Sequence, residues 1–353
     1  MSVNETSTFK IDGWMIRSVA TTATKFVTAM SHNGKSNVRV YNVGDNPKED
    51  IIRLEDENGK ENFKNINSVA IFYTNDIMKT TYVAAGGDSG TTYVWVLSEG
   101  TRPVQTMNNQ FAGEGYPIRS LMMDNMYLLR LSDSKSGKKG VVYTLNVTKY
   151  EEIGSQTKTA VLGGGLKHIS MHGSYILTVN DNKRVQLWSV GRNRNSIKTY
   201  SEENFNKLKD IKNIDLIALG KKRFVTVTKS DINLYDYDGN LKNTIKNDSK
   251  PTDVSMHMEK IVACFKDRAK VWNDDGEELA ELKVEGATKV AVRGNTIIVI
   301  GTKKAHIFAC VIASEPCPSR ASEGLRPEEI PLYILKAITP EVKVHPQYGK
   351  LRY

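Results

Sequence analysis

Seven times along the 353-residue chain, a strand-like run ends in an aliphatic residue followed by an aromatic one. The pairs are Val40-Tyr41, Val94-Trp95, Val142-Tyr143, Leu187-Trp188, Leu234-Tyr235, Val271-Trp272 and Ile307-Phe308. They recur every 36 to 54 residues over the whole chain. A period in this range, kept over this length, indicates a repeat architecture.

A second pattern precedes each aromatic pair. It is a short alternating run that begins with an apolar or small residue, at residues 16–20, 66–70, 118–122, 166–170, 214–218, 251–255 and 287–291. These two patterns always occur in the same order, and they predict seven copies of one four-stranded β unit. A closed ring of seven such units uses about this chain length. We therefore expect an all-β, seven-bladed β-propeller over residues 1–313, with blades that start near residues 14, 66, 117, 166, 213, 251 and 287.

The two ends of the repeat region predict how the ring closes. The last blade lacks a fourth strand, because Glu315-Pro316-Cys317-Pro318 cannot pair as a central strand. Residues 6–11 form a strand-like run that has no blade of its own. We expect this N-terminal strand to complete the last blade and remove its open edge.

Residues 314–353 form an extension to the propeller. Residues 314 to about 329 are rich in Pro, Ser, Glu and Arg, a composition typical of a linker. The tail becomes apolar again from Ile330 onward. A tail of this kind docks either on the propeller or on a partner, and the sequence leaves both alternatives open.

Four-stranded units whose third strand closes with an aliphatic–aromatic pair resemble the WD-repeat family of β-propellers. The resemblance covers roughly residues 6–313 and implies a scaffold that binds peptides or domains, usually without catalysis. Only Tyr235-Asp236 keeps the aromatic-Asp dipeptide of the family, and the Gly-His pair that opens a repeat is absent. The family's Asp–His–Ser/Thr–Trp hydrogen-bond network is therefore not transferred to this chain.

The recurring aromatic residue has a structural explanation. A blade cannot bury both of its faces alone, so a large flat side chain fills the wedge between one blade and the next. We expect Trp95, Trp188 and Trp272 to pack between blades, because a ligand-binding role would not recur in every unit.

Composition limits the cellular setting only broadly. The formal charge of +9 is spread along the chain, which favours a solvated Lys-rich surface and only weakly indicates nucleic acid or an acidic partner. Three cysteines without framework spacing fit a reducing compartment. No apolar run approaches the length of about 18 residues that a membrane helix needs. We expect a cytoplasmic or nuclear protein that does not enter a membrane.

Three motifs contain residue types that are typical of catalytic, metal or phosphate sites. Each of them lacks the neighbouring residues or secondary structure that such a site needs. Gly87-Asp88-Ser89-Gly90 resembles the nucleophile stretch of trypsin-like proteases over four residues, but a Gly-rich turn explains it better. On a strand, His168 and His172 would be about 13 Å apart. Met171-His172 aligns with Met256-His257, which predicts turn positions at the ends of two inner strands. A strand, not a helix, follows Gly163-Gly164-Gly165, so no phosphate cradle is predicted. We expect no catalytic residues, no metal and no cofactor.

The aligned inner strands predict a binding surface at one mouth of the central channel. Their leading residues carry cations, with an acidic sector, and they are Arg17, Asn67, Arg119, Lys167, Asp215, Asp253 and Lys289. Such a ring of charges would suit an acidic or phosphorylated peptide. Scattered, solvated charges are the alternative interpretation.

A second cluster of cations is predicted on the opposite face. It combines a turn of blade 4 with a turn of blade 5, and its members are Arg192, Arg194, Lys221, Lys222 and Arg223. No aromatic residues are interleaved with these cations, so base stacking is not indicated.

These observations favour a non-catalytic protein–protein interaction scaffold, either an adaptor or a substrate receptor. We expect a monomeric propeller that acts within a larger complex. The alternative is a propeller associated with nucleic acid or the ribosome through its basic face. A propeller enzyme is a third class, for which the sequence offers no positive sign.

Overall fold

Short β-rich runs separated by tight turns fold into antiparallel sheets of four strands, repeated seven times. The computed structural model describes residues 2–11, 13–43, 52–74, 79–107, 116–124, 127–133, 138–144, 157–162, 165–180, 185–190, 197–199 and 213–311. The predicted all-β, seven-bladed propeller is confirmed.

The first four blades follow one another along the chain. Blade 1 contains β2 (Met15–Thr21), β3 (Lys25–His32), β4 (Lys35–Asn42) and β5 (Ile52–Leu54), with β6 (Phe63–Lys64) also paired to β4. Blade 2 contains β7 (Ile66–Tyr73), β8 (Thr81–Gly87), β9 (Thr92–Val96) and β10 (Gln105–Met107), with the short 3-10 helix η1 (Leu97–Glu99) after β9. Blade 3 contains β11 (Ile118–Asp124), β12 (Tyr127–Ser132), β13 (Lys139–Thr144) and β14 (Thr157–Leu162). Blade 4 contains β15 (Leu166–His172), β16 (Tyr175–Asn180), β17 (Val185–Val190) and β18 (Ile197–Thr199).

The last three blades complete the ring. Blade 5 contains β19 (Ile214–Leu219), β20 (Arg223–Thr228), β21 (Asp231–Asp236) and β22 (Leu241–Ile245). Blade 6 contains β23 (Asp253–His257), β24 (Lys260–Cys264), β25 (Arg268–Asn273) and β26 (Glu278–Lys283). Blade 7 contains β27 (Lys289–Arg293), β28 (Thr296–Ile300), β29 (Lys304–Val311) and, from the other end of the chain, β1 (Ser2–Lys10).

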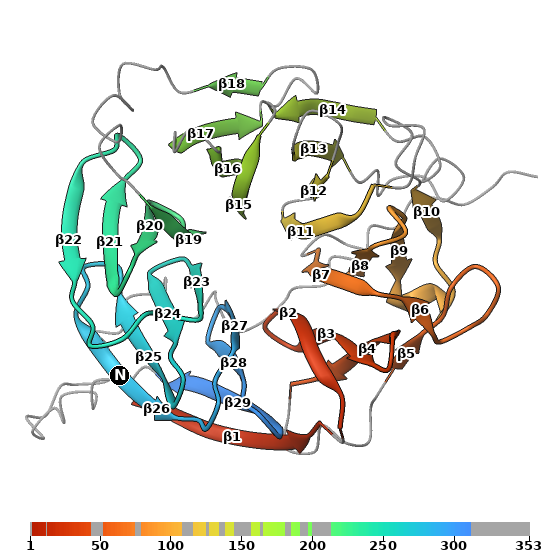
Figure 1. Ribbon diagram of the computed structural model, residues 1–353, viewed down its shortest axis with the longest axis horizontal. Helices are drawn as coiled ribbons and strands as arrows, with labels where there is room; N and C mark the ends of the chain where they lie inside the picture. The colour runs from red at the N-terminus through yellow and green to blue at the C-terminus, as the bar shows by residue number, and fades with distance from the viewer. Residues whose placement is uncertain are drawn as a thin grey trace, which may run out of the picture. The chain divides into compact units, whose positions relative to one another are not determined.

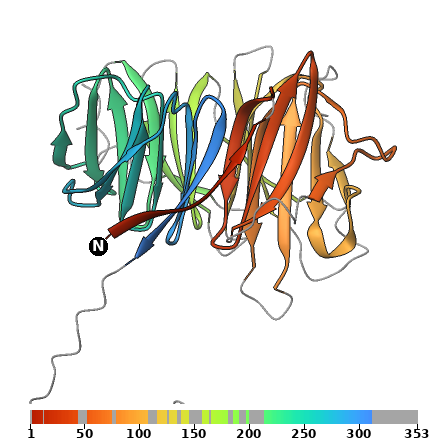
Figure 2. The ribbon, with the colours of Figure 1, turned by 90° about the horizontal axis from the view of Figure 1, so that it is seen from below.

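The blades are arranged around a central axis, with the first strand of blades 1 to 6 and β27 of blade 7 innermost (Figure 1). Each inner strand contacts the inner strands of both neighbouring blades, and β27 contacts β2 to close the circle. Seen from the side, the strands run largely along the axis of the ring (Figure 2). The turns that join them therefore gather at its two ends.

The N-terminal strand closes the ring, as predicted. β1 pairs antiparallel with β29, from Ser2 opposite Val311 to Lys10 opposite Lys304. The strand begins at Ser2 and is longer than the expected run from residue 6, because β29 offers a partner along its whole length. Ile11, directly after this strand, is buried.

Among the described residues, the hydrophobic core forms seven clusters, and each is shared by two neighbouring blades. Seven aromatic residues end the repeated pairs, and the structure describes the side chains of six of them. Each of these six packs with residues of the preceding blade. They are Tyr41 with blade 7, Trp95 with blade 1, Trp188 with blade 3, Tyr235 with blade 4, Trp272 with blade 5 and Phe308 with blade 6. The prediction that the tryptophans pack between blades is confirmed.

Two of these tryptophans also carry a hydrogen bond. The indole Nε1 of Trp95 donates to the carbonyl oxygen of Glu55 in the preceding blade, at 3.0 Å. The Nε1 of Trp188 donates to Oγ1 of Thr178 on the adjacent strand, at 2.9 Å. The first of these bonds joins two blades, and the second joins two strands of blade 4.

Two further features bear on the sequence analysis. Cys264 and Cys310 are buried free thiols, and burial raises the pKa of both. No helix within the described residues is long and apolar enough to cross a membrane. A separate unit, residues 313–353, contains the predicted linker and tail, which lie outside the described residues.

The closing strand generates a test of the ring. Deleting residues 1–11 would leave the edge of β29 unpaired and remove Ile11 from the core. We expect a loss of at least about 1.5–3 kcal/mol in the free energy of unfolding, the value of one buried apolar side chain. A synthetic peptide of residues 1–11, added in trans, should restore part of the melting temperature. An unchanged melting temperature in the truncated protein would contradict ring closure by this strand.

Candidate binding site at the channel mouth

Backbone bulges determine where the predicted mouth residues point. In blades 2 to 5 the pairing between the first and second strands shifts by one residue directly after the first position of the inner strand, and in blade 1 it shifts after the second position, Ile16. The residues that occupy these shifts are Arg17, Asn67, Arg119, Lys167 and Asp215. A bulge leaves one residue out of the ladder and redirects its side chain. Five of the seven predicted mouth residues are therefore bulge residues.

Arg17 and Asn67 begin a chain of contacts that runs along the mouth. Nε of Arg17 donates to Oγ of Ser31 at 2.9 Å, and its Nη1 reaches Oδ1 of Asn67 in the next blade at 3.5 Å. Asn67 in turn donates to the carbonyl oxygen of Ile118 in blade 3, at 3.1 Å. These side chains link three successive blades while they lie at the rim.

Two mouth residues are neutralised by ion pairs. Nε of Arg119 donates to Oδ2 of Asp133 at 2.8 Å. A carboxylate oxygen of Asp215 lies 3.0 Å from Nζ of Lys250. Both partners come from outside the predicted set. The cationic character of the mouth therefore depends on Arg17, Lys167 and Lys289, which have no ion-pair partner among the described residues.

The remaining mouth residues join blades as well. Nζ of Lys167 donates to the carbonyl oxygen of Ile214 in blade 5, at 3.2 Å. The carboxylate of Asp253 accepts the N–H of Val290 in blade 7, at 3.0 Å, beside Lys289. Burial raises the pKa of the Asp253 carboxyl, although the charge of Lys289 and the N–H of Val290 favour its ionised form.

Serine residues below the mouth were not singled out by the sequence analysis. Oγ of Ser18 accepts the N–H of Val69, and Oγ of Ser68 accepts the N–H of Leu121. Two residues further along the inner strands, Ser170 and Ser255 accept the N–H groups of Leu219 and Val292. In each case a hydroxyl on one inner strand satisfies a backbone donor on the next. The signal was present in the sequence as a serine at a similar place in several aligned inner strands.

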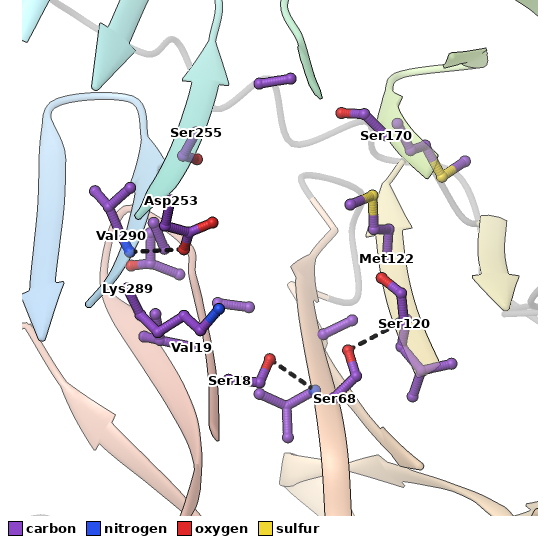
Figure 3. A pocket seen from close by; sticks show the side chains of 18 of the residues that line it. Ser18, Val19, Ser68, Ser120, Met122, Ser170, Asp253, Ser255, Lys289 and Val290 are labelled. Atoms are coloured by element: carbon purple, nitrogen blue, oxygen red, sulfur yellow. Dashed lines mark hydrogen bonds between the residues drawn. The ribbon is translucent and has the colours of Figure 1, made fainter. Parts of the chain in front are cut away.

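These inner strands enclose a cavity of about 340 Å³, which is lined both by mouth residues such as Arg17 and by residues of the opposite end such as His257. Figure 3 shows Ser18, Ser68, Ser120, Ser170 and Ser255 on separate strands around it, with Asp253 and Lys289 nearby. Met122 and Val19 also line the wall. The cavity thus combines hydroxyl groups and apolar surface below a largely cationic rim.

A second group of polar residues lies at the opposite ends of the inner strands. Nη2 of Arg293, in blade 7, is 2.7 Å from Oδ1 of Asp124, in blade 3. His172 of blade 4 has its Nδ1 3.8 Å from Oδ2 of Asp124, and its ring centroid is 5.1 Å from that of His257 in blade 6. Blades that are not neighbours are therefore joined across the axis at this end.

Burial sets the protonation of this cross-axis group. The pKa of His257 is lowered to about 3, mainly by burial and also by the nearby charges of Arg293 and His172. Neutral Nδ1 of His257 accepts the N–H of Gly294 at 3.1 Å. Burial alone would raise the pKa of Asp124, but the Arg293 guanidinium outweighs it and lowers that pKa.

The structure divides the predicted basic cluster on the opposite face. Lys221 and Lys222 are exposed in the turn after β19. Arg223 instead binds Oδ1 of Asp275 in blade 6, at 2.7 Å. Arg192 and Arg194 lie outside the described residues.

The motifs that resembled chemical sites have structural surroundings. Asp88 and Ser89 form the turn between β8 and β9, and Gly90 there has a φ of 74°, which favours glycine. Oδ1 of Asp88 accepts a hydrogen bond from Asn67 at 2.7 Å. His168 lies on β15, where burial lowers its pKa to about 4. Gly163 and Gly164 lie outside the described residues.

Comparison with known proteins identifies the architecture. The WD40 repeats of RRP9, known from a crystal structure, match with a TM-score of 0.62 and 10% sequence identity, over 87% of this chain and 99% of that chain. No family model and no curated protein sequence matches the chain. The chain therefore has the seven-bladed fold of WD-repeat propellers, and 833 chains of solved structure share this likeness, so it does not specify a partner.

His257 generates a pH-dependent prediction. The unfolded state takes up a proton near the ordinary histidine pKa of about 6.5, whereas the folded state does so only near pH 3. Stability should therefore fall as the pH decreases between these values. His257→Asn retains an acceptor for the N–H of Gly294 without this titration. We expect the parent to lose up to about 2 kcal/mol more than the variant between pH 6.5 and 5, at 1.36 kcal/mol per pKa unit. Parallel pH profiles in urea unfolding would contradict a neutral, buried His257.

Proposed function

We propose that this protein is a non-catalytic interaction scaffold, of the adaptor or substrate-receptor type, that binds an acidic or phosphorylated peptide across the channel mouth. The observation that carries the proposal is the set of bulges that directs side chains of five blades to one rim. Arg17, Lys167 and Lys289 supply the charge there, because the other cation, Arg119, is paired with Asp133.

The rim is suited to an anionic group for a physical reason. Arg17 and Lys167 are already held by neighbouring blades, so binding requires little further ordering of their long side chains. Asp253 supplies negative charge on one side of the rim, whereas Asp215 is paired with Lys250. A peptide with an anionic residue would therefore bind in one preferred orientation, which favours recognition of a specific segment.

The alternative is a scaffold that binds nucleic acid or the ribosome through the opposite face. Its support is the overall charge of +9 together with exposed Lys221 and Lys222. The pairing of Arg223 with Asp275 reduces the charge of that cluster. Phosphate contacts of this kind weaken steeply with salt, so salt dependence separates the two functions.

Degenerate peptide pools test the proposal on the full-length protein. Nonapeptide pools with a central phosphoserine, glutamate or serine should bind in that order of decreasing affinity. The double variant Arg17→Glu/Lys167→Glu should weaken binding of the phosphoserine pool at least about tenfold, since charged hydrogen bonds contribute about 1.5–3 kcal/mol each.

The matched control is Lys221→Glu/Lys222→Glu, which makes the same change of charge on the opposite face. It should leave peptide binding intact, and melting temperatures should show that both variants fold. Equal peptide binding by the parent and the mouth variant would refute the proposal. Loss of a 20-nucleotide single-stranded RNA only in the control variant, with steep salt dependence, would favour the nucleic-acid alternative.

A further inference from the structure

A groove lies where the two ends of the propeller meet. It runs between the β1–β2 connection and the turn after β28, and its volume is about 760 Å³, within the range of about 300–1,000 Å³ typical of ligand pockets. Ile11, Trp14, Met15 and Ile16 supply its apolar surface. The N–H of Ile11 donates to the carbonyl oxygen of Lys303 at 3.0 Å, which ties the two walls together.

Two residues form the apolar surface of the groove: Trp14, which neighbouring side chains hold in place, and Met15, which is exposed to solvent. The guanidinium carbon of Arg39 lies 5.5 Å from the ring centroid of Trp14, and the ring of His32 lies 5.6 Å from it. These contacts hold the indole on blade 1. Met15 beside it is 59% exposed, the highest value among the large hydrophobic side chains of the described residues. An unbranched thioether of this kind adapts to different apolar partners.

The rim of the groove is cationic. Lys10, Lys303 and Lys304 are exposed and line it, and no carboxylate is among its described lining residues. Lys10 and Lys304 lie opposite each other in the β1–β29 pairing. Three like charges around an apolar surface favour a partner segment that carries negative charge beside an apolar side chain.

We propose that this groove binds an acidic protein segment through an apolar anchor residue that packs on Trp14 and Met15. The groove lies at the same end of the inner strands as the mouth, because Ile16 precedes Arg17 and Thr288 precedes Lys289. The inference deepens the proposed function, on which it rests in assigning a peptide partner. It adds a second, separable point of contact that selects for an apolar residue.

Three fluorescein-labelled heptapeptide pools test this assignment on the full-length protein. The first has two central positions drawn from Leu, Ile, Phe and Met between Asp/Glu flanks. The second replaces the central positions with Ser, and the third replaces the flanks with Lys. By fluorescence anisotropy, we expect the first pool to bind most tightly. Met15→Asp and Lys303→Glu/Lys304→Glu should each weaken it at least about tenfold, because one loses apolar burial and the other reverses the charge.

Matched controls are available at a distance from the groove. Leu241→Asp changes a 55% exposed apolar residue on β22, and Lys221→Glu/Lys222→Glu reverses two exposed charges in the turn after β19. Neither should alter binding. The proposal is overturned if the first pool binds no better than the Ser or Lys pools, or if Met15→Asp binds it as the parent does.

The mouth variant separates this inference from the proposed function. Binding that is lost in Met15→Asp but retained in Arg17→Glu/Lys167→Glu supports the groove and contradicts the mouth. The reverse pattern supports the mouth and contradicts the groove. Loss of binding in both variants supports one peptide site that extends over both.

Discussion

Packing between blades is the interaction on which the rest of this structure depends. A four-stranded sheet has two faces, and a single blade cannot bury both. Each hydrophobic cluster is accordingly shared by two neighbours, and large aromatic side chains such as Trp95 and Trp272 fill the junctions. Hydroxyl groups on the inner strands, for example that of Ser68, satisfy backbone donors of the next blade. The ring is thereby continuous in both its apolar and its polar contacts.

The candidate binding surfaces follow from this packing. Because all inner strands begin at the same end, their bulge residues meet at one rim, where Arg17 and Lys167 keep their charge without an ion-pair partner in the described part of the chain. The junction of blades 7 and 1 differs from the others, since β1 arrives there from the start of the chain. Its connection to β2 leaves Met15 exposed along a groove, beside Trp14, which is only partly buried against the core of this junction. Closure of the ring thus pairs the edge of β29 and also forms the groove that we propose as a contact surface.

The sequence predicted those features that repeat. Periodic patterns in the sequence predicted the recurring aromatic residues, the order of the blades and the closing strand. Such patterns are visible in the sequence because each short strand has its own local preference for β structure. The bulge at Arg17 was not predictable, because the register of pairing is decided by the assembled sheet. The ion pair of Arg223 with Asp275 and that of Arg293 with Asp124 join residues far apart in the chain, so they depend on the tertiary structure. The sequence analysis did not single out Trp14, although it is an aromatic residue outside the seven repeated pairs.

The free energy of unfolding of Trp272→Ala, measured by urea denaturation, tests most directly whether packing between blades holds the ring. Trp272 is buried between blades 5 and 6, so its removal leaves a cavity in one junction. The account predicts a loss of about 3–5 kcal/mol, with one cooperative transition for the whole propeller. Leu241→Ala, at an exposed position, should stay within about 0.5 kcal/mol of the parent. If Trp272→Ala is as stable as the parent, junction packing does not hold the ring.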